Sequence, residues 1–555
     1  MQHRADSQNI TVRIWVICVL LIAAFVVLRM PFALWQFEVH SDEQYYSIGA
    51  AKMMATGDYL VPRGVAGDLR LKKPPLPYYY AVAGYTMFGQ SVLGAKIMWL
   101  LTGAIILGLT FVLARVIGAT VGGAFVAMTA LAGHRIFVEN TTQHIPDMPL
   151  ILGITIALVC FCKIMQSRDA PPPWLYYLGY GGIAYAILAK GMLALVFLPV
   201  LLIVRLIYRR QMPPGRIGHE LAAVLLATVL ATWWFVAIWL RYPDELVSQF
   251  VGDQLTEKAS FSVIDALARL RKTITDLFLP FIPFLLAFAL GLKWPKPGRL
   301  QNPAVALCVF WIVVVLVLFA FSTALFERYI LPAAPAAAAL IGLYASRFEP
   351  ALLTKRLGRS IRVFSFLPLV VAGLASYLFW VANQQTTGIG IAITAALLFI
   401  LSWWIAAKGA IWAKSAILGG TYVLAVAAAL PLYFTLIYPM HGHIAANHIK
   451  GISAKTYVLN NRRLVDQTGL VTNRIEDIRY LTTIDDIPNT GPAIILATDE
   501  TAILTLENLG YYITLAHDFP TSGFAPSQLI DALRQDQLDS FRRAYGSQLI
   551  LAYLP

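Results

Sequence analysis

Uninterrupted apolar runs of about twenty residues recur along this chain up to residue 437. A helix of about twenty residues is long enough to cross the hydrocarbon core of a bilayer. The hydrophobic share of 58% and the charged share of only 13% exclude an ordinary soluble enzyme and a disordered chain. The sequence therefore predicts a polytopic α-helical membrane protein.

The hydropathy pattern predicts about thirteen transmembrane helices. The first run is too long for the core of a signal peptide, and no small-residue cleavage site follows it, so we expect it to remain as the first span. The predicted spans are 12–35, 92–113, 118–138, 147–165, 174–189, 191–208, 217–240, 274–292, 303–321, 329–346, 362–381, 388–406 and 411–437.

The net charge of +13 is spread over short loops rather than gathered on one domain, which argues against nucleic-acid binding. Basic residues concentrate in alternate loops, for example at Arg168, in 205–216 and in 355–362. Loops of this kind lie on the cytoplasmic side. The pattern therefore predicts a protein of the bacterial inner membrane with a cytoplasmic N-terminus, and it places loop 38–80 and everything after residue 438 in the periplasm.

Residues 440–555 differ in composition from the rest, because charges become frequent and the long apolar runs stop. Short strand patterns occur at 493–497, 511–516 and 548–554, and helical patterns occur at 502–509 and 526–545. We therefore expect two domains: a transmembrane domain, 1–439, and a small periplasmic α/β domain, 440–555.

Loop 38–80 is polar, charged and rich in proline, and it follows the first span directly. Ser41 or Asp42 is placed to cap a helix that Gly57 would end. A second amphipathic segment, 77–88, begins with Tyr78, Tyr79 and Tyr80, which we expect to anchor it at the membrane interface.

Three acidic residues are candidates for chemistry. Asp42 or Glu43 could act as a general base, although a helix cap with a first-turn acid is an alternative for this pair. Asp147 lies at the outer end of the fourth span, where it caps the helix or supplies a second carboxylate facing Asp42. Two such carboxylates could orient an acceptor or bind a divalent cation.

Basic residues face the same compartment in this topology. Lys72 and Lys73 precede two prolines at the membrane surface and suit a lipid-borne phosphate, with attraction to anionic headgroups as the alternative. Arg328 begins the tenth span and is either a second phosphate contact or a cation that snorkels to the interface.

The order of these motifs resembles the lipid A aminoarabinose transferases and the wider bacterial relatives of the protein O-mannosyltransferases, which are GT-C glycosyltransferases. This chain differs from the aminoarabinose transferases at two positions, where they carry an arginine in place of Tyr45 and a glutamate in place of Lys72. The similar segments are Asp42–Tyr46, Thr56–Arg63, Lys73–Pro74, Ile145–Pro149, Ala189–Gly191, Trp233–Trp234 and Arg328–Pro332.

The resemblance implies a GT-C fold and transfer of a sugar, aminoarabinose or a related monosaccharide, from a polyprenyl-phosphate donor to a periplasm-facing lipid such as lipid A. A protein O-mannosyltransferase-like enzyme is the alternative, and a transporter is a weaker one because the charges lie at one membrane face rather than at the midplane. The expected site consists of catalytic Asp42, Asp147 and Glu43, donor-phosphate contacts Lys73, Lys72 and Arg328, and cavity residues Tyr46, Tyr45, Arg63 and Tyr79.

Overall fold

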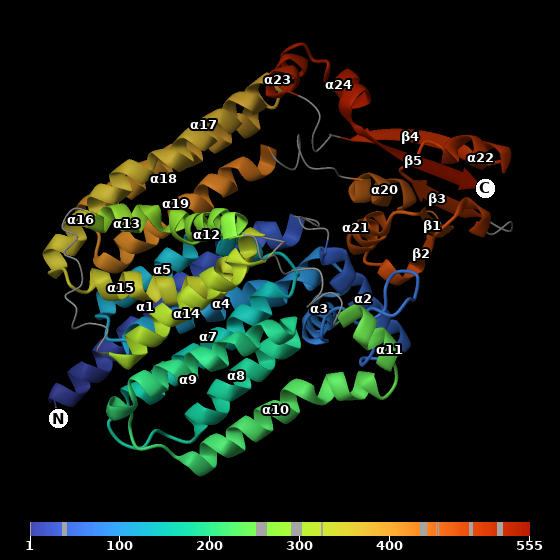
Figure 1. The fold of residues 1–555 in the computed structure, drawn as a ribbon. Helices are drawn as coiled ribbons and strands as arrows, with labels where there is room; N and C mark the ends of the chain where they lie inside the picture. Colours follow the sequence, from blue (N-terminus) through green and yellow to red (C-terminus); the bar gives the residue numbers. More distant parts are fainter. Residues whose placement is uncertain are drawn as a thin grey trace.

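The protein is described from a computed structural model, which covers residues 2–35, 42–250, 263–289, 302–322, 326–432, 441–450, 452, 454–487, 492–518 and 525–554. A bundle of helices makes up most of the molecule, and a small α/β unit lies beyond one end of it (Figure 1). The N-terminus and the connection between α9 and α10 lie at the other end of the bundle (Figure 1).

Nineteen α-helices precede the C-terminal unit in the part of the chain that the structure describes. Their bounds are α1 (Gln2–Trp35), α2 (Glu43–Thr56), α3 (Leu76–Phe88), α4 (Val92–Val116), α5 (Val121–Ala132), α6 (Arg135–Asn140), α7 (Asp147–Gln166), α8 (Trp174–Lys190), α9 (Phe197–Ile207), α10 (Ile217–Trp239), α11 (Pro243–Leu246), α12 (Val263–Phe278), α13 (Ile282–Ala289), α14 (Pro303–Ala320), α15 (Ala334–Ala345), α16 (Pro350–Phe364), α17 (Phe366–Val381), α18 (Gln385–Lys408) and α19 (Ile411–Leu432).

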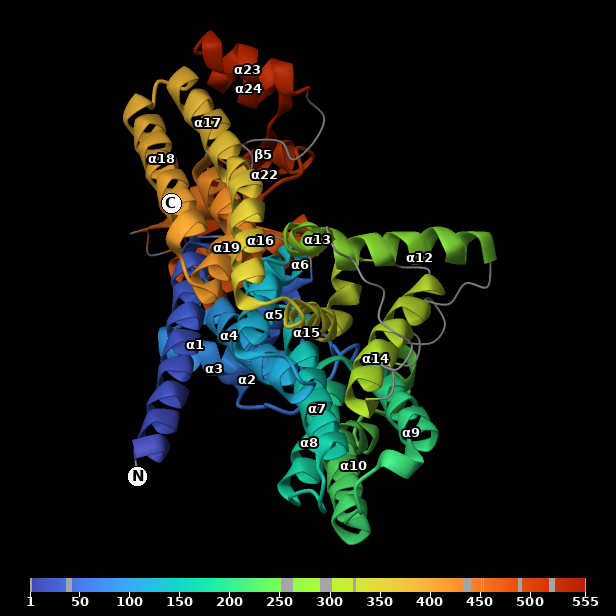
Figure 2. The same ribbon diagram turned by 90° about the vertical axis from the view of Figure 1, so that its left-hand side faces the viewer.

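Within the described residues, nine helical stretches are long and apolar enough to cross a membrane. The polytopic helical class predicted from the sequence is confirmed, whereas the predicted number of thirteen spans is not. Two of the predicted spans correspond to the shorter apolar helices Val121–Ala132 and Met192–Ile207. The predicted span 274–292 is divided within its described part, where the 3-10 turn η4 (Leu279–Phe281) separates α12 from α13. Figure 2 shows α12 lying across the direction of its neighbours.

Small residues allow the bundle helices to approach closely. Gly153 of α7 faces Gly182 of α8, and a Cβ atom built on either glycine would lie 2.5 Å from the carbonyl oxygen of the other. Such contacts suit helix association in lipid, where tight backbone packing replaces the hydrophobic effect as the driving force.

The segment after α1 folds over the end of the bundle. Helix α2 ends at Gly57, which has a left-handed conformation (φ 69°), as predicted. Asp42 occupies the N-cap position, but its side chain makes no capping hydrogen bond. The expectation that the tyrosines of α3 anchor at a membrane interface is wrong for Tyr78 and Tyr80, which are 0% and 7% exposed. Each packs against an aromatic neighbour inside the protein instead.

The C-terminal unit holds a five-stranded sheet in the order β2-β1-β3-β5-β4. The strands are β1 (Lys455–Leu459), β2 (Ile478–Leu481), β3 (Ala493–Ala497), β4 (Tyr512–Asp518) and β5 (Ser547–Leu554). Strand β1 pairs in parallel with β2 and β3, while β5 is antiparallel to β3 and β4.

The sequence patterns located β3, β4 and β5 but missed the first two strands. The predicted helix 526–545 is two helices, α23 (Pro526–Arg534) and α24 (Leu538–Tyr545), separated by Asp536 with a positive φ of 54°. The sequence also missed α20 (His441–Ile449) and α21 (Arg462–Thr472), whereas α22 (Ala502–Asn508) matches its prediction.

Helix α21 connects the sheet unit to the bundle through a buried polar cluster, which consists of Glu43, Ser47, Lys96, His144 and Asp466. All five side chains belong to residues that are 0% exposed. His144 lies between two residues of α2, with its Nδ1 atom 2.7 Å from a carboxylate oxygen of Glu43 and its Nε2 atom 2.5 Å from the hydroxyl of Ser47. Asp466 of α21 completes the cluster from the side of the C-terminal unit.

Burial makes Asp466 sensitive to pH. Desolvation raises the pKa of its carboxyl from the ordinary 3.8 to about 6, against opposing effects of His144 and Lys96 and with a further increase from Glu43. Between pH 3.8 and about 6, the carboxyl of Asp466 is therefore protonated in the folded protein but ionised in the unfolded chain.

We predict that the free energy of unfolding falls as pH rises from about 4 to about 6, by up to about 3 kcal/mol, because one pKa unit corresponds to about 1.4 kcal/mol. Asp466→Asn lacks this titration, so its melting temperature should vary less over the same range. Thermal unfolding of both proteins in detergent tests this, and parallel pH profiles would contradict it.

Candidate functional site

A cavity of about 690 Å³ opens where α2, the segment after it, α7, α8 and α14 meet. Its lining combines charged, aromatic and aliphatic side chains. The lining residues are Asp42, Tyr45, Tyr46, Arg70, Lys72, Lys73, Pro146, Asp147, Lys190, Met192, Leu193, Val196, Leu318, Phe319, Phe321, Ser322, Phe326, Arg328 and Tyr329.

Arg328 connects the two carboxylates of the cavity. Its guanidinium lies 3.6 Å from Asp42 through one nitrogen and 3.3 Å from Asp147 through Nε. Lys190 lies 2.6 Å from the other oxygen of Asp147. The side chain of Asp147 is only 4% exposed, so these two cations replace the water that a carboxylate needs. In contrast, the side chain of Asp42 is 45% exposed toward the cavity.

Cations outnumber carboxylates in the lining by five to two. Arg70 lies over the ring of Tyr45, with 3.3 Å between the guanidinium carbon and the ring centroid, and Lys190 lies 4.5 Å from the ring centroid of Tyr329. Lys73 and Lys190 line the same cavity and interact electrostatically. This surplus of positive charge in a concave, partly apolar site attracts an anion.

Much of the cavity lining is apolar. The short helix η1 (Met192–Val196) supplies aliphatic side chains, and the end of α14 with Phe321 supplies further aliphatic and aromatic surface. The cavity is therefore amphipathic, because it combines cations with apolar surface suited to a hydrocarbon chain.

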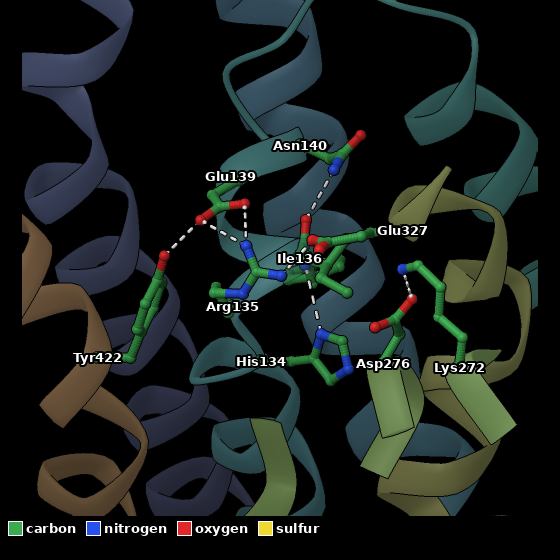
Figure 3. A network of polar contacts seen from close by, with 10 residues as sticks. His134, Arg135, Ile136, Glu139, Asn140, Lys272, Asp276, Glu327 and Tyr422 are labelled. Carbon is green, nitrogen blue, oxygen red and sulfur yellow. Dashed lines mark hydrogen bonds and ion pairs between the residues drawn. The ribbon is translucent and has the colours of Figure 1, made fainter. Parts of the chain in front are cut away.

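A polar network behind the cavity positions η6 (Glu327–Ala333), the helical turn that carries Arg328 (Figure 3). Arg135 of α6 forms ion pairs with Glu327 and with Glu139, and Tyr422 of α19 donates a hydrogen bond to Glu139 (Figure 3). Because Glu327 precedes Arg328, the pair with Arg135 fixes the backbone from which the bridging arginine projects.

Seven of the ten predicted site residues line this cavity, and three do not. Glu43 points away from it into the buried cluster, where it lies 2.7 Å from His144 and 3.9 Å from Lys96. Its place beside Asp42 in the sequence suggested a shared site, but consecutive helix residues point in different directions.

Arg63 and Tyr79 lie outside the lining because local backbone groups hold them. Arg63 donates a hydrogen bond to the carbonyl of Gly67, in a tight turn where Arg63 also pairs with Leu69. Tyr79 donates to the carbonyl of Tyr59. Both side chains therefore stabilise loop 58–74 rather than the cavity.

Arg70 and Lys190 line the cavity although they were not predicted as site residues from the sequence. Tyr329, which was considered with Arg328 as a phosphate contact, lines it as well. Lys190 was the clearest signal, because it is the only charge between two apolar runs. Arg70 lies between Leu69 and Leu71 and shortly before two lysines, and nothing in that pattern shows which of the cations turns inward.

The divalent-cation site considered from the sequence at Asp42 and Asp147 stays a prediction. Arg328 occupies the position between Asp42 and Asp147, and both oxygens of Asp147 face cations. Within the part of the chain that the structure describes, no group of three or more histidine, cysteine or acidic side chains has the arrangement to hold a metal ion.

The fold and the cavity define a polytopic helical membrane protein whose site, at one end of the bundle, combines cations with apolar side chains. The profile of the dolichyl-phosphate-mannose-protein mannosyltransferase family matches residues 13–244. The resemblance predicted from the sequence is confirmed: the chain is similar in sequence and in fold to the aminoarabinose transferases.

Curated relatives are distant in sequence. An undecaprenyl phosphate-α-4-amino-4-deoxy-L-arabinose arabinosyl transferase of Proteus mirabilis is 26% identical over 379 residues, which cover 64% of each chain. An uncharacterised protein of Aquifex aeolicus is 26% identical over 344 residues, which cover 61% of this chain and 65% of the relative. The aligned region thus spans a little under two thirds of the length of these relatives.

Solved structures share the whole fold. ArnT from Cupriavidus metallidurans in its apo state superimposes with a TM-score of 0.68 over 97% of both chains at 18% identity. The same protein bound to undecaprenyl phosphate gives a TM-score of 0.67 over 97% of this chain and 98% of that one. At this identity the likeness establishes the fold, including the small C-terminal sheet unit.

The position of Glu43 leads to a prediction that separates a structural role from a catalytic one. Glu43→Gln removes the carboxylate that lies 2.7 Å from His144 and 3.9 Å from Lys96, so we expect a loss of about 3–5 kcal/mol of stability and a clearly lower melting temperature. The activity per folded molecule should change less than twofold in a transfer assay. A normal melting temperature with abolished activity would assign Glu43 to catalysis instead.

Proposed function

We propose that this protein is a membrane glycosyltransferase that moves a sugar from a polyprenyl-phosphate donor to a lipid acceptor. The observation that carries the proposal is the amphipathic cavity, whose lining combines five cations and two carboxylates with apolar side chains. The names of the similar proteins agree with this class, since they are an arabinosyl transferase and a mannosyltransferase family.

The cations of the cavity suit the phosphate of such a donor, and its apolar residues suit the polyprenyl chain. The phosphate lies against the ammonium groups of Lys72 and Lys73 and the guanidinium of Arg70, since cations at a phosphate make strong charge-assisted contacts. The first isoprene units follow the apolar surface of η1 and α14. One of the similar structures is described as bound to undecaprenyl phosphate, which supports a donor of this kind.

The reaction is a displacement at the anomeric carbon of the sugar. An acceptor oxygen forms the new bond to this carbon, the bond from carbon to the donor phosphate oxygen breaks, and the polyprenyl phosphate leaves with the electron pair. Lys73, Lys190 and Arg328 stabilise the negative charge that grows on the leaving phosphate.

Asp42 is the carboxylate that faces the acceptor, because it is half-exposed to the cavity while Asp147 is enclosed by Lys190 and Arg328. Asp42 takes the proton of a hydroxyl acceptor, or orients a phosphate acceptor that is already ionised. Asp147 holds the cations in place and does not exchange protons with the substrate.

The acceptor we propose is lipid A or a related glycolipid, and the sugar is aminoarabinose or a related monosaccharide. A specific observation supports a second candidate: the mannosyltransferase profile matches the part of the chain that carries Asp42, Lys73 and Asp147. Transfer to a protein is therefore the alternative. Mass spectrometry of outer-membrane glycolipids and of periplasmic proteins, with and without the gene, separates the two.

The proposed acceptor requires the cavity to open on the periplasmic side of the inner membrane. Basic loops such as 205–216 lie at the opposite end of the bundle, which supports this orientation. A reporter enzyme fused after Pro555 should be active only as a periplasmic reporter, and a fusion at Arg210 only as a cytoplasmic one. The reverse result would refute the proposed orientation.

The role of Asp42 is tested by Asp42→Asn. The substitution keeps the size of the side chain and removes the negative charge, so we expect a loss of about 10²–10⁴ in transfer rate with an unchanged melting temperature. A phosphate acceptor would place the loss at the lower end of this range. Radiolabelled or mass-resolved transfer from undecaprenyl-phosphate aminoarabinose to lipid A measures the rate.

Asp58→Asn is the matched control, because Asp58 lies outside the cavity. Its Oδ1 atom accepts hydrogen bonds from the amides of Leu60 and Val61, which an asparagine oxygen also accepts. The control should transfer at the rate of the wild type. Unchanged turnover in Asp42→Asn would remove this residue from the mechanism.

A further inference from the structure

A second basic groove lies next to the cavity, on the C-terminal unit. It has a volume of about 310 Å³ and is lined by Gln44, Asn460, Asn461, Arg462, Arg463 and Tyr480. Gln44 belongs to α2, and the other lining residues belong to the C-terminal unit. The groove thus lies across the junction between the sheet unit and the helix that follows Asp42.

The groove forms where the parallel strands end. Strand β1 ends at Leu459 and leads through Asn460 and Asn461 into α21, while β2 brings Tyr480 alongside. The carboxyl ends of parallel strands, together with the amino end of the following helix, are where α/β units bind ligands, and a helix amino end favours anions. Asn461 caps α21 by accepting the amide of Leu464 at 3.0 Å.

The side chains around the groove are held by one another. Tyr480 donates a hydrogen bond to the side-chain oxygen of Asn460 at 3.2 Å, and the guanidinium of Arg462 lies 6.0 Å from the ring centroid of Tyr480. Arg462 and Arg463 themselves are exposed to solvent. The guanidinium groups of these two arginines are planar and carry several N–H donors each, which match the oxygens of a phosphate.

The groove and the cavity are neighbours along α2. Gln44 lines the groove, and the next two residues, Tyr45 and Tyr46, line the cavity. Arg462 is close enough to interact electrostatically with Tyr45 and with Asp68 of the loop over the cavity. Helix α21 keeps this spacing because its Asp466 is buried against α2 in the polar cluster.

We propose that this groove binds a phosphate of the acceptor, at a distance from the reacting oxygen, through Arg462 and Arg463. The inference rests on the proposed function and makes its acceptor a phosphorylated glycolipid headgroup. The cavity already has cations for the single phosphate of the donor. A phosphate bound in the groove therefore belongs to the acceptor. The acceptor would extend from the groove, past Tyr45, into the cavity.

The experiment compares two acceptors in nanodiscs of phosphatidylcholine, which carries no net charge. The acceptors are diphosphoryl lipid A and its monophosphoryl form, and undecaprenyl-phosphate aminoarabinose is the donor. For the wild type we expect the KM of the monophosphoryl acceptor to be about tenfold higher than that of the diphosphoryl acceptor, since an interaction with a charged group has this size.

The double variant Arg462→Gln/Arg463→Gln should raise the KM of the diphosphoryl acceptor to that of the monophosphoryl one. Its kcat, its KM for the donor and its melting temperature should stay at wild-type values. The double lysine variant, which keeps both charges, should retain most of the difference. Arg474→Gln is the matched control, because Arg474 is an exposed arginine of the same unit outside the groove.

Three results would overturn the inference. The double glutamine variant could keep the preference for the diphosphoryl acceptor, or could raise the KM of both acceptors equally. Its effect could also appear only when phosphatidylglycerol is added to the nanodiscs, which would assign the groove to bilayer headgroups. These outcomes leave the proposed function intact, whereas a wild type that transfers to neither lipid would refute the proposed function and the inference together.

Discussion

The enclosed carboxylate of Asp147 determines how the cavity is arranged. A carboxylate at the end of an apolar bundle is stable only when cations compensate for its lost hydration. Lys190, at the end of α8, and Arg328, at the start of η6, provide that compensation from two different parts of the chain. Because Arg328 also reaches Asp42 at the N-cap of α2, one set of ion pairs connects four elements of the cavity, α2, α7, α8 and η6. Arg135 pairs with Glu139 and also with Glu327, the residue before Arg328. Tyr422 donates a hydrogen bond to Glu139 and completes this network.

The division of labour between Asp42 and Asp147 follows from this arrangement. Both are aspartates at the start of a helix, yet one is open to the cavity and the other is closed by two cations. The surrounding charges therefore decide which carboxylate meets substrate. The same principle explains Glu43, which stands next to Asp42 in the chain but has its partners in the buried cluster below.

The sequence predicted the membrane class, the mixed C-terminal unit and most of the cavity, because those features depend on local patterns. Long apolar runs indicate membrane helices wherever they pack, and Gly57 indicates a helix end by its own conformational freedom. Contacts between distant segments could not be predicted. The burial of Asp466, the inward turn of Arg70 and the separation of Glu43 from Asp42 depend on how α21, the loop after α2 and the loop before α7 meet in space. Strands β1 and β2 were missed because the polar residues around them hid their short apolar patterns.

The buried junction between α2 and α21 has a consequence for how the two parts of the chain can evolve. Four ionisable side chains are enclosed there, and one of them belongs to the C-terminal unit. If that unit were lost or exchanged for one without a matching acid, Lys96, His144 and Glu43 would meet water or a foreign surface. Such a change would alter the charge balance beneath the helix that carries Asp42. Replacing the sheet unit would therefore disturb the buried charges beneath α2, because this unit and the membrane helices share one set of buried ionisable groups.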